Sequence, residues 1–196
     1  MEGKVCIVTG SSSGIGEGIA LLFAKRGASV TICGRDITRL QTVLRSCVEA
    51  SGGHDDRFLA VAGDVVDSSV RQNIVQKTVD KFGRLDVLVA NAGTMGAKTS
   101  IVNATEESYD QMMNLNCKST FFLIQQALPH LESSKGNIVV VSSSMSLFVC
   151  SMSNTVYPMS KAAVDHMVRC LAVDLGPKNI RVNSVNPGFV PTTLIK

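Results

Sequence analysis

The sequence predicts an α/β fold built on a doubly wound parallel sheet. Short apolar runs alternate along the chain with amphipathic segments, a pattern typical of strands joined by crossover helices. The runs are nearly continuous in apolar residues, as expected for strands buried on both faces. Six strands are predicted, at residues 5–8, 30–33, 58–61, 87–90, 138–141 and 180–185.

Length and composition limit the class of protein. The chain has 196 residues, which predicts a single domain over 1–196. Charged residues are 18%, below the average of about 25%, so much of the chain should be buried and disorder is excluded. The formal net charge is +3, basic residues are not clustered and Trp is absent, so no nucleic-acid partner is expected.

The predicted helices show apolar stripes of 3.6-residue period and recognisable end signals. The first stripe is Ile15, Ile19, Leu22 and Phe23, and the last is Val164, Met167, Val168, Leu171 and Leu175. Asp36 is a predicted N-cap, while Gly27 and Gly83 are predicted to end helices.

Cysteines, histidines and apolar runs argue against a metal, a disulfide or a membrane span. None of the six cysteines forms a C-x-x-C pair, so we expect small buried hydrophobes in a reducing compartment. His54 beside Asp55 and Asp56 is interpreted as a solvated loop rather than a metal site. The first strand begins by Lys4 and no run approaches the roughly 18 residues of a span, so we expect a cytoplasmic protein without a leader.

A glycine- and serine-rich turn follows the first strand. Residues 9–16 read TGSSSGIG and lead at once into a helix. Glycines let the backbone approach a ligand closely, and the first N–H groups of a helix attract phosphate. The spacing G-x-x-x-G-x-G differs from the common dinucleotide fingerprint G-x-G-x-x-G. A tight turn without a ligand therefore stays open as an alternative.

The end of the second strand indicates which dinucleotide would bind. A carboxylate at this place would bind the ribose 2′-hydroxyl of NAD(H), but Gly34 stands there and Arg35 follows. A guanidinium can fork onto a 2′-phosphate. We therefore favour NADP(H). Asp36, interpreted as a helix cap, leaves NAD(H) possible.

Three further turns follow strands at the same predicted edge, where ligands of doubly wound sheets bind. Each turn is ordinary when taken alone. They are Gly63-Asp64-Val65, Asn91-Ala92-Gly93 and NPGFVPT at 186–192.

A tyrosine and a lysine follow the serine run at 142–144. Tyr157 and Lys161 are four residues apart and share a helix face. An ammonium about 5 Å away, at an effective dielectric near 20, would stabilise the phenolate by about 3 kcal/mol and lower its pKa by about two units. A serine hydroxyl can hydrogen-bond the reacting oxygen. Together with a nicotinamide, this set predicts hydride transfer to or from a carbonyl. Alone, the pair would be a chance spacing.

In this order the pieces resemble the short-chain dehydrogenase/reductase family, and its carbonyl reductase-like members in particular. The matching motifs are TGSSSGIG, DV at 64–65, NAG at 91–93, YPMSK at 157–161 and RVNSVNPGFV at 181–190. The resemblance covers 4–192 and implies a Rossmann-type dinucleotide-binding domain. It also implies a small carbonyl or alcohol substrate and a homodimer or homotetramer.

The resemblance implies roles for individual residues. Tyr157 would be the acid/base, Lys161 would bind the nicotinamide ribose and lower the Tyr157 pKa, and Asn116 would hold a water of the proton relay. Ser143 would be the catalytic serine. With Arg35, the implied cofactor contacts are Gly10, Ser12, Ser13, Gly14, Ile15, Gly16, Asp64, Val65, Asn91, Ala92, Gly93, Tyr157, Lys161, Pro187, Gly188, Val190 and Thr192.

Two of these assignments have alternatives. Reading forward from the strand favours Ser143, whereas counting back from Tyr157 by the commonest family spacing gives Ser144. We prefer Ser143 because the strand sets the register more firmly than the loop 145–155. Asn114 is the alternative to Asn116, which stands at the family's distance ahead of Phe121.

The chain departs from the family after its last motif. Family members usually continue with a substrate-covering loop, a helix and a seventh strand, but this sequence stops at Lys196. We therefore expect strand 180–185 at a sheet edge and a substrate pocket without its lid. The leading hypothesis is an NADP(H)-dependent carbonyl reductase or alcohol dehydrogenase acting on an apolar ketone. The alternative is a truncated, non-catalytic nucleotide-binding or dimerisation protein.

Overall fold

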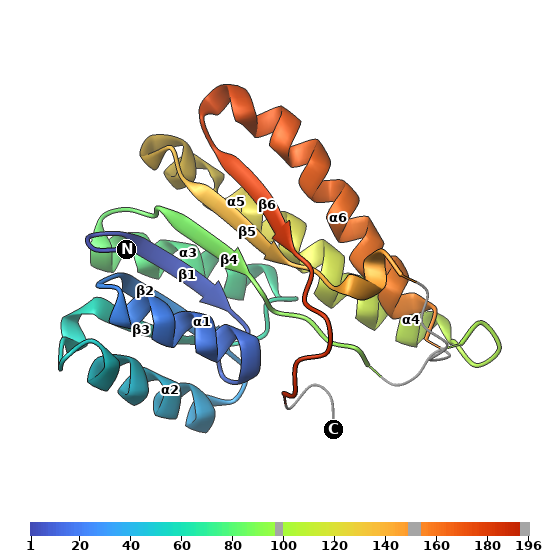
Figure 1. Ribbon diagram of the computed structural model, residues 1–196, viewed down its shortest axis with the longest axis horizontal. Coiled ribbons are helices and arrows are strands. Elements are labelled where there is room, and N and C mark those ends of the chain that lie inside the picture. Colours follow the sequence, from blue (N-terminus) through green and yellow to red (C-terminus); the bar gives the residue numbers. More distant parts are fainter. Residues whose placement is uncertain (97–99, 149–153, 193–196) are drawn as a thin grey trace.

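One parallel sheet organises the computed structural model, which describes residues 1–96, 100–148 and 154–192. Six parallel strands lie in the order β3-β2-β1-β4-β5-β6 (Figure 1). The predicted sheet is confirmed, and each strand end lies within one residue of its predicted place. The strands are β1 (Val5–Thr9), β2 (Ser29–Gly34), β3 (Phe58–Ala62), β4 (Val87–Ala90), β5 (Asn137–Val141) and β6 (Arg181–Val185).

The strand order reverses between β1 and β4. The chain runs outward from β1 to β3, then returns to pair β4 with the other side of β1. Ligands of such sheets bind beyond the carboxyl ends of the strands at this reversal. The ends of β1 and β4, at Thr9 and Ala90, therefore mark the expected site.

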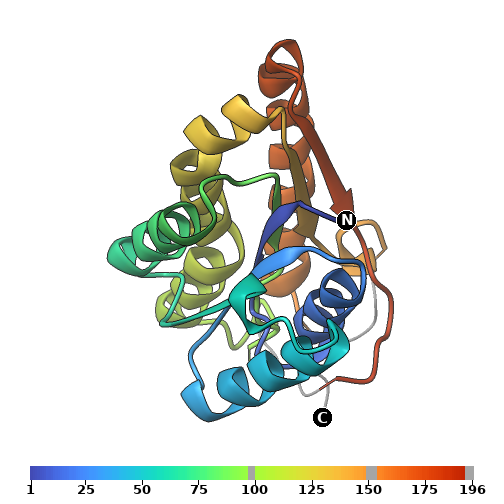
Figure 2. The same cartoon turned by 90° about the vertical axis from the view of Figure 1, so that its left-hand side faces the viewer.

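Helices cover both faces of the sheet, and they bury two separate cores (Figure 1, Figure 2). Ala20 and Leu40 belong to the core on one face, and Ile74, Leu131 and Val164 belong to the core on the other. The first face carries α1 (Gly14–Lys25) and α2 (Ile37–Ala50), and the second carries α3 (Ser68–Phe82), α5 (Ser119–Ser134) and α6 (Val156–Leu175).

The strand residues alternate between these two cores. Along β1, Cys6 and Val8 pack with α1 and α2, while Ile7 faces the opposite core. All five residues of this strand are buried. The continuous apolar runs of the sequence thus have the predicted cause, since each strand must satisfy two apolar layers.

The apolar face predicted for the first helix is confirmed only in part. Ile19 and Phe23 pack half-buried against the core on this face, whereas Leu22 is 49% exposed. The residues of α1 that are buried are Gly16, Ala20 and Ala24. Small side chains let the helix axis lie close to the strands, which a stripe of large residues would prevent.

The last helix and the predicted helix ends agree with the sequence. The stripe 164–175 of α6 packs against the larger core. Asp36 caps α2, accepting a hydrogen bond from the Arg39 backbone N–H at 3.0 Å. Gly83 ends α3 with φ of 74°, and Gly27 has φ of 79° immediately after α1.

The cysteine prediction holds for part of the chain. Cys117 is half-buried and Cys170, on the solvent side of α6, is exposed, so buried packing is wrong for these two. Cys150 lies outside the described residues. Burial raises the pKa of Cys6 and Cys33 to about 12, which makes their thiols unreactive. The buried cysteines are Cys6, Cys33 and Cys47.

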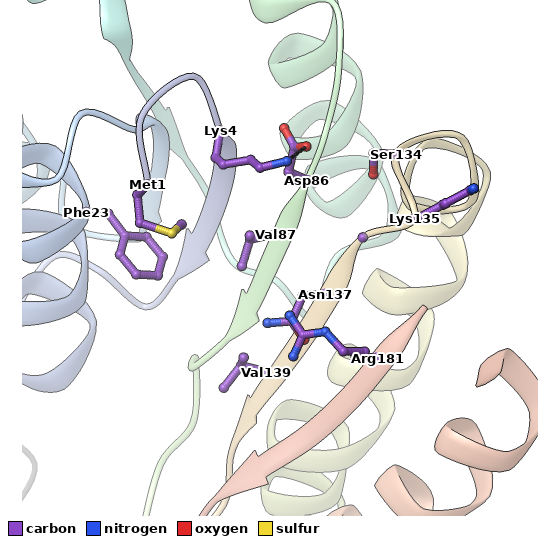
Figure 3. A pocket seen from close by; sticks show the side chains of 11 residues that line it. Met1, Lys4, Phe23, Asp86, Val87, Ser134, Lys135, Asn137, Val139 and Arg181 are labelled. Atoms are coloured by element: carbon purple, nitrogen blue, oxygen red, sulfur yellow. Dashed lines mark hydrogen bonds and ion pairs between the residues drawn. The ribbon is translucent and has the colours of Figure 1, made fainter. Parts of the chain in front are cut away.

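A hollow of about 370 Å³ lies at the amino ends of the strands (Figure 3). At its rim Asp86, just before β4, is 3% exposed. Its carboxylate accepts from Lys4 Nζ at 3.1 Å, Val5 N at 3.0 Å, and Arg84 Nε and Nη2 at 2.9 and 2.7 Å. These contacts fasten the start of β1 to the start of β4.

β6 pairs with β5 alone among the described strands, so it lies at the sheet edge as expected. Within 1–96, 100–148 and 154–192, the helices include none long and apolar enough to cross a membrane.

Candidate active site

A cavity of about 550 Å³ opens across the carboxyl ends of the strands. Loops that follow all six strands contribute to its wall. Gly16 and Asn116 are predicted site residues that do not line it. Those that do are Gly10, Ser12, Ser13, Gly14, Ile15, Arg35, Asp64, Val65, Asn91, Ala92, Gly93, Ser143, Tyr157, Lys161, Pro187, Gly188, Val190 and Thr192.

The glycine-rich turn needs its glycines for shape. Gly10 and Gly14 have φ of +64° and +62°, a region that favours glycine. A Cβ on Gly10 would lie 2.8 Å from the Cα of Ala92, and one on Gly16 would lie 2.4 Å from the Gly10 carbonyl oxygen. Gly16 therefore allows close packing of α1 against the turn, and its contact with a cofactor stays a prediction.

Two segments hold this turn from outside. The Asn91 amide donates to the carbonyl oxygens of Thr9 and Gly10 at 2.9 and 3.1 Å. The segment after β6 reaches the same turn, where Thr192 Cβ would lie 3.1 Å from a Cβ on Gly14 (Figure 1). The turn leads into the N-terminus of α1, whose first N–H groups lack intrahelical acceptors. A phosphate fits this backbone cradle.

The end of the cavity beside β2, where the adenosine of a dinucleotide is expected, carries two guanidinium groups. The Arg35 side chain is 73% exposed, with Nη1 3.5 Å from the Asp64 carboxylate. Arg39, which sequence analysis missed, also lines the cavity, and its Nε lies 3.2 Å from the Asp36 carboxylate. Both ion pairs are exposed, so they cost little to rearrange around a phosphate.

Gly34 keeps this end free of a side chain. A Cβ there would lie 2.8 Å from Ser12 Oγ, so the packing of the glycine-rich turn requires glycine at the end of β2. A carboxylate that would bind a ribose 2′-hydroxyl therefore has no room at this position.

Tyr157 and Lys161 are buried together on the first turns of α6. They are 6% and 5% exposed, and Lys161 Nζ lies 5.9 Å from the centre of the Tyr157 ring. Lys161 Nζ donates to the Val141 carbonyl oxygen at 2.9 Å, which ties the helix to the end of β5.

The expected lowering of the tyrosine pKa is wrong for the chain alone. Burial raises the pKa of Tyr157, and the opposing effect comes from a side-chain hydrogen bond with Ser143 rather than from Lys161. Burial also lowers the pKa of Lys161 to about 8, against the attraction of Asp165. The prediction assumed a charged lysine beside a solvated phenol. In the structure both groups are removed from water, and this burial has the larger effect on both pKa values.

The three serines of the run at 142–144 have different partners. Ser143 is 7% exposed and is the serine that interacts with the Tyr157 side chain. Ser142 Oγ donates to the Lys161 carbonyl oxygen at 3.2 Å. The Ser144 backbone N–H donates to the Pro187 carbonyl oxygen at 2.9 Å. Geometry thus favours Ser143 over Ser144.

Asn116 lies behind the cavity wall, in the π-helical turn Asn114–Lys118 that joins α4 (Glu106–Met113) to α5. Its Oδ1 accepts from Thr94 N at 2.8 Å, and its Nδ2 donates to Thr94 O at 2.9 Å and Ser160 Oγ at 3.0 Å. A Cβ on Gly93 would lie 3.2 Å from Asn116 Oδ1 and 3.4 Å from Lys161 Nζ. The side chain of Asn116 therefore positions the β4 loop beside the lysine.

Several cavity residues carry no recognisable motif. Arg39 could have been found from the cap at Asp36, which places residue 39 in the first helical turn beside Arg35. The rest are ordinary apolar or small residues whose position depends on the fold: Cys33, Thr94, Met95, Leu115, Val141 and Met145. Across the described ranges, no group of three His, Cys, Asp or Glu side chains is placed to hold a metal.

The fold and the site define a Rossmann-like α/β nucleotide-binding protein. A family model described as short chain dehydrogenase matches residues 4–196. The chain therefore belongs to the short-chain dehydrogenase family, whose members are oxidoreductases that transfer hydride with a nicotinamide dinucleotide.

Three proteins illustrate the similarity, which covers nearly the whole chain. A 3-oxoacyl-[acyl-carrier-protein] reductase of Thermotoga maritima is 38% identical over 99% of this chain and 77% of its own length. The apo-form glucose dehydrogenase of Caenorhabditis elegans is 41% identical with a TM-score of 0.87, covering 95% of this chain and 74% of that one. A Brucella melitensis 3-ketoacyl-(acyl-carrier-protein) reductase complexed with NADH is 30% identical with a TM-score of 0.90, covering 99% and 78%.

Proposed function

We propose that this protein is an NADP(H)-preferring carbonyl reductase or alcohol dehydrogenase in which Tyr157 exchanges the proton with the substrate oxygen. The observation that carries the proposal is the burial of Tyr157 with Lys161 and Ser143 at the inner end of a cavity that begins at a phosphate-binding turn. Hydride and proton chemistry would then meet at one end of a single elongated site.

The bound dinucleotide supplies or accepts the hydride, and the chain's own residues handle the proton. Because burial raises the pKa of Tyr157, its phenol is protonated at neutral pH and suits proton donation to a carbonyl oxygen. Ser143 can hydrogen-bond the same substrate oxygen. Lys161, with a pKa of about 8, is mostly charged at pH 7 and stabilises the phenolate left behind. These states favour reduction.

The preference for NADP(H) rests on the adenosine end. Gly34 leaves no carboxylate at the end of β2, and Arg35 and Arg39 both line the cavity there. Two cations can neutralise a 2′-phosphate that NAD(H) lacks. The Brucella melitensis relative is complexed with NADH and an L-sorbose reductase of Gluconobacter frateurii with NADPH, so relatives of this fold bind either dinucleotide. The two arginines would give this chain its preference.

The substrate class follows from the apolar rim of the inner end. Phe189, which is 77% exposed, lines the cavity together with Met95 and Met145. Leu147 and Phe148 follow the serine run in the sequence and are 60% and 67% exposed. A ketone with an apolar body of medium size would cover these side chains.

Assembly and compartment are part of the same proposal. Phe121 on α5 is 42% exposed and stacks edge-on against Phe122. With α6, this helix would provide the subunit contacts of a homodimer or homotetramer. Unpaired cysteines among the described residues suit the cytoplasm.

The test uses Tyr157→Phe with Tyr109→Phe, a half-exposed tyrosine of α4, as its matched control. Loss of the transferable proton should lower reduction of a reactive dicarbonyl at least about 100-fold in Tyr157→Phe, with NADPH affinity nearly unchanged. Turnover that survives in Tyr157→Phe would refute the acid/base role.

Cofactor preference is tested by nicotinamide fluorescence titration with NADPH and with NADH. Arg35→Ser should weaken NADPH binding about tenfold and leave NADH binding unchanged. Arg45→Ser, on the solvent side of α2, is the control and should change neither. Equal affinity of the unmodified chain for both dinucleotides would contradict the preference.

A further inference from the structure

Asp165 is a buried carboxylate close behind the proposed active site. It lies on α6 one turn after Lys161 and is 7% exposed. Its Oδ2 accepts from Ser146 Oγ at 2.5 Å and from Asn186 Nδ2 at 2.8 Å. Its Oδ1 is buried and has no hydrogen-bond partner among the described residues.

This carboxylate joins three segments that meet at the cavity. Asn186 immediately precedes the Pro187-Gly188 turn, and its Nδ2 also lies 3.2 Å from the Ser143 carbonyl oxygen. Ser146 Oγ lies 2.6 Å from that same carbonyl oxygen and 3.0 Å from Asn186 Nδ2. Asp165 thus fixes the backbone of Ser143 relative to the turn after β6.

Stability does not explain the arrangement. An ionised carboxylate removed from water is costly unless paired and fully hydrogen-bonded. No cation of the described residues lies within ion-pair distance of Asp165, and one of its oxygens is unsatisfied. A buried charge without a matched cation adds little stability, so the contribution of Asp165 to the fold is the placement of its two hydrogen-bond donors.

Its charge acts on the lysine one turn away. Lys161 loses much of its affinity for a proton through burial, and Asp165 is the charged side chain that opposes this loss. The other groups around Asp165, from the serine loop and from the segment after β6, are the neutral Ser146 and Asn186, and Tyr157 and Lys161 lie on its own helix.

We propose that Asp165 is a positioning residue of the active site. Through Ser146 and Asn186 it sets the Ser143 loop and the Pro187-Gly188 turn, and its negative charge lies one helical turn from Lys161. This proposal rests on the proposed function, because Ser143, Lys161 and the Pro187-Gly188 turn are the groups that the proposed reaction would use.

The charge role is tested on the cofactor-free chain. Asp165→Asn keeps the acceptor oxygen for Ser146 and Asn186 and removes the charge. NMR of lysine side chains labelled at Cε, with the Lys161 signal assigned from Lys161→Met, should show the Lys161 pKa falling by about one unit. Asp174→Asn, an exposed aspartate of the same helix, should leave it unchanged. If Asp165→Asn does not fold, Asp165→Ser takes its place. An unchanged Lys161 pKa would overturn the charge role.

The loop role is tested separately with Asn186→Ala and Ser146→Ala, which keep the carboxylate. Each should weaken NADPH binding by about 5- to 10-fold in the fluorescence titration, since each removes about one hydrogen bond to a charged group. The Lys161 pKa should stay in place. NADPH affinity within twofold of the unmodified chain would overturn the loop role. Absence of NADPH binding by the unmodified chain would overturn that role and the proposed function, while the lysine titration would still judge the charge role.

Discussion

Two carboxylates of this protein are almost inaccessible to water, and their surroundings differ. Asp86, at the amino ends of the strands, accepts four hydrogen bonds through both oxygens, three of them from cations. Asp165, behind the carboxyl ends, accepts two from neutral groups through one oxygen. The cations of Asp86 are half-exposed, whereas the lysine nearest Asp165 in sequence is buried.

The difference distinguishes a stabilising cluster around Asp86 from the proposed functional cluster around Asp165 and Lys161. Burial pushes the pKa of Asp86 upward, but hydrogen bonds from Arg84, Val5 N and Lys4 outweigh it, and the net pKa is lowered. At the other end, burial prevails and the pKa of Lys161 falls to about 8. Groups whose pKa is shifted toward neutral pH by burial, like Lys161, are concentrated at sites where the chemistry needs a proton.

The largest expected effect is on activity, from Lys161→Met. Removing the cation should lower reductase turnover at least about 100-fold, because the Tyr157 phenolate loses its stabilising charge. The free energy of unfolding should not fall, since methionine fills a similar volume and avoids burying a charge. Turnover and urea unfolding measured on one preparation check both. A lowered free energy of unfolding together with unchanged turnover would show that Lys161 stabilises the fold and does not serve the reaction.

The converse change is Asp86→Asn. It should lower the free energy of unfolding by about 1–3 kcal/mol, because Asp86 is buried while its cations remain partly solvated. NADPH affinity should not change. Urea unfolding is the measurement, with the exposed Asp80→Asn of α3 as control. Loss of NADPH binding with an unchanged free energy of unfolding would contradict the distinction between the Asp86 cluster and the Asp165 cluster.

The smallest effect is the pH dependence of stability. Asp86 has a lowered folded pKa, so its stabilisation is present above the unfolded pKa and lost as pH falls through the folded value. Lys161 titrates at about 8 when folded and near its ordinary 10.5 when unfolded, so between these values the unfolded state binds more protons and stability rises with pH.

Urea unfolding over a pH series checks both signs. The acid loss should shrink in Asp86→Asn, and the alkaline rise should be missing in Lys161→Met. Buried Cys6 and Cys33 titrate in the opposite direction at alkaline pH, and neither pKa depends on Lys161, so the difference between Lys161→Met and the unmodified chain isolates the lysine. Asp86 contributes to the raised pKa of Cys6, so Asp86→Asn is compared only at acid pH, where both thiols stay protonated. An alkaline rise that persists in Lys161→Met would contradict the assignment.

Local patterns predicted most of the fold and much of the cavity wall. Strand limits, the Asp36 cap and the Gly83 helix end depend on residues near one another in the chain, and all were confirmed. The prediction was less accurate for the buried face of α1, because several faces of this helix are apolar and packing against the sheet determines which one is buried. Large residues at 15–23 suggested the apolar face of α1, but Ile19 and Phe23 are only half-buried there, and the fully buried positions are the small Gly16, Ala20 and Ala24.

The site shows the same division. Motifs placed Tyr157, Lys161 and the glycine-rich turn in one cavity. They did not show that Gly16 and Asn116 lie behind its wall, because spacing along a chain does not say which side of a turn faces a ligand. Arg39 entered the cavity through the turn of α2 rather than through a motif.

The sequence by itself determined the doubly wound sheet, the order of its loops and the chemical groups at their ends, since each follows from a local period or a short motif. Tertiary structure alone decided the protonation of Tyr157 and Lys161 and the junction of Ser143, Asn186 and Asp165. Burial and through-space contact set these properties, and they join β5, β6 and α6 across more than 20 residues of chain.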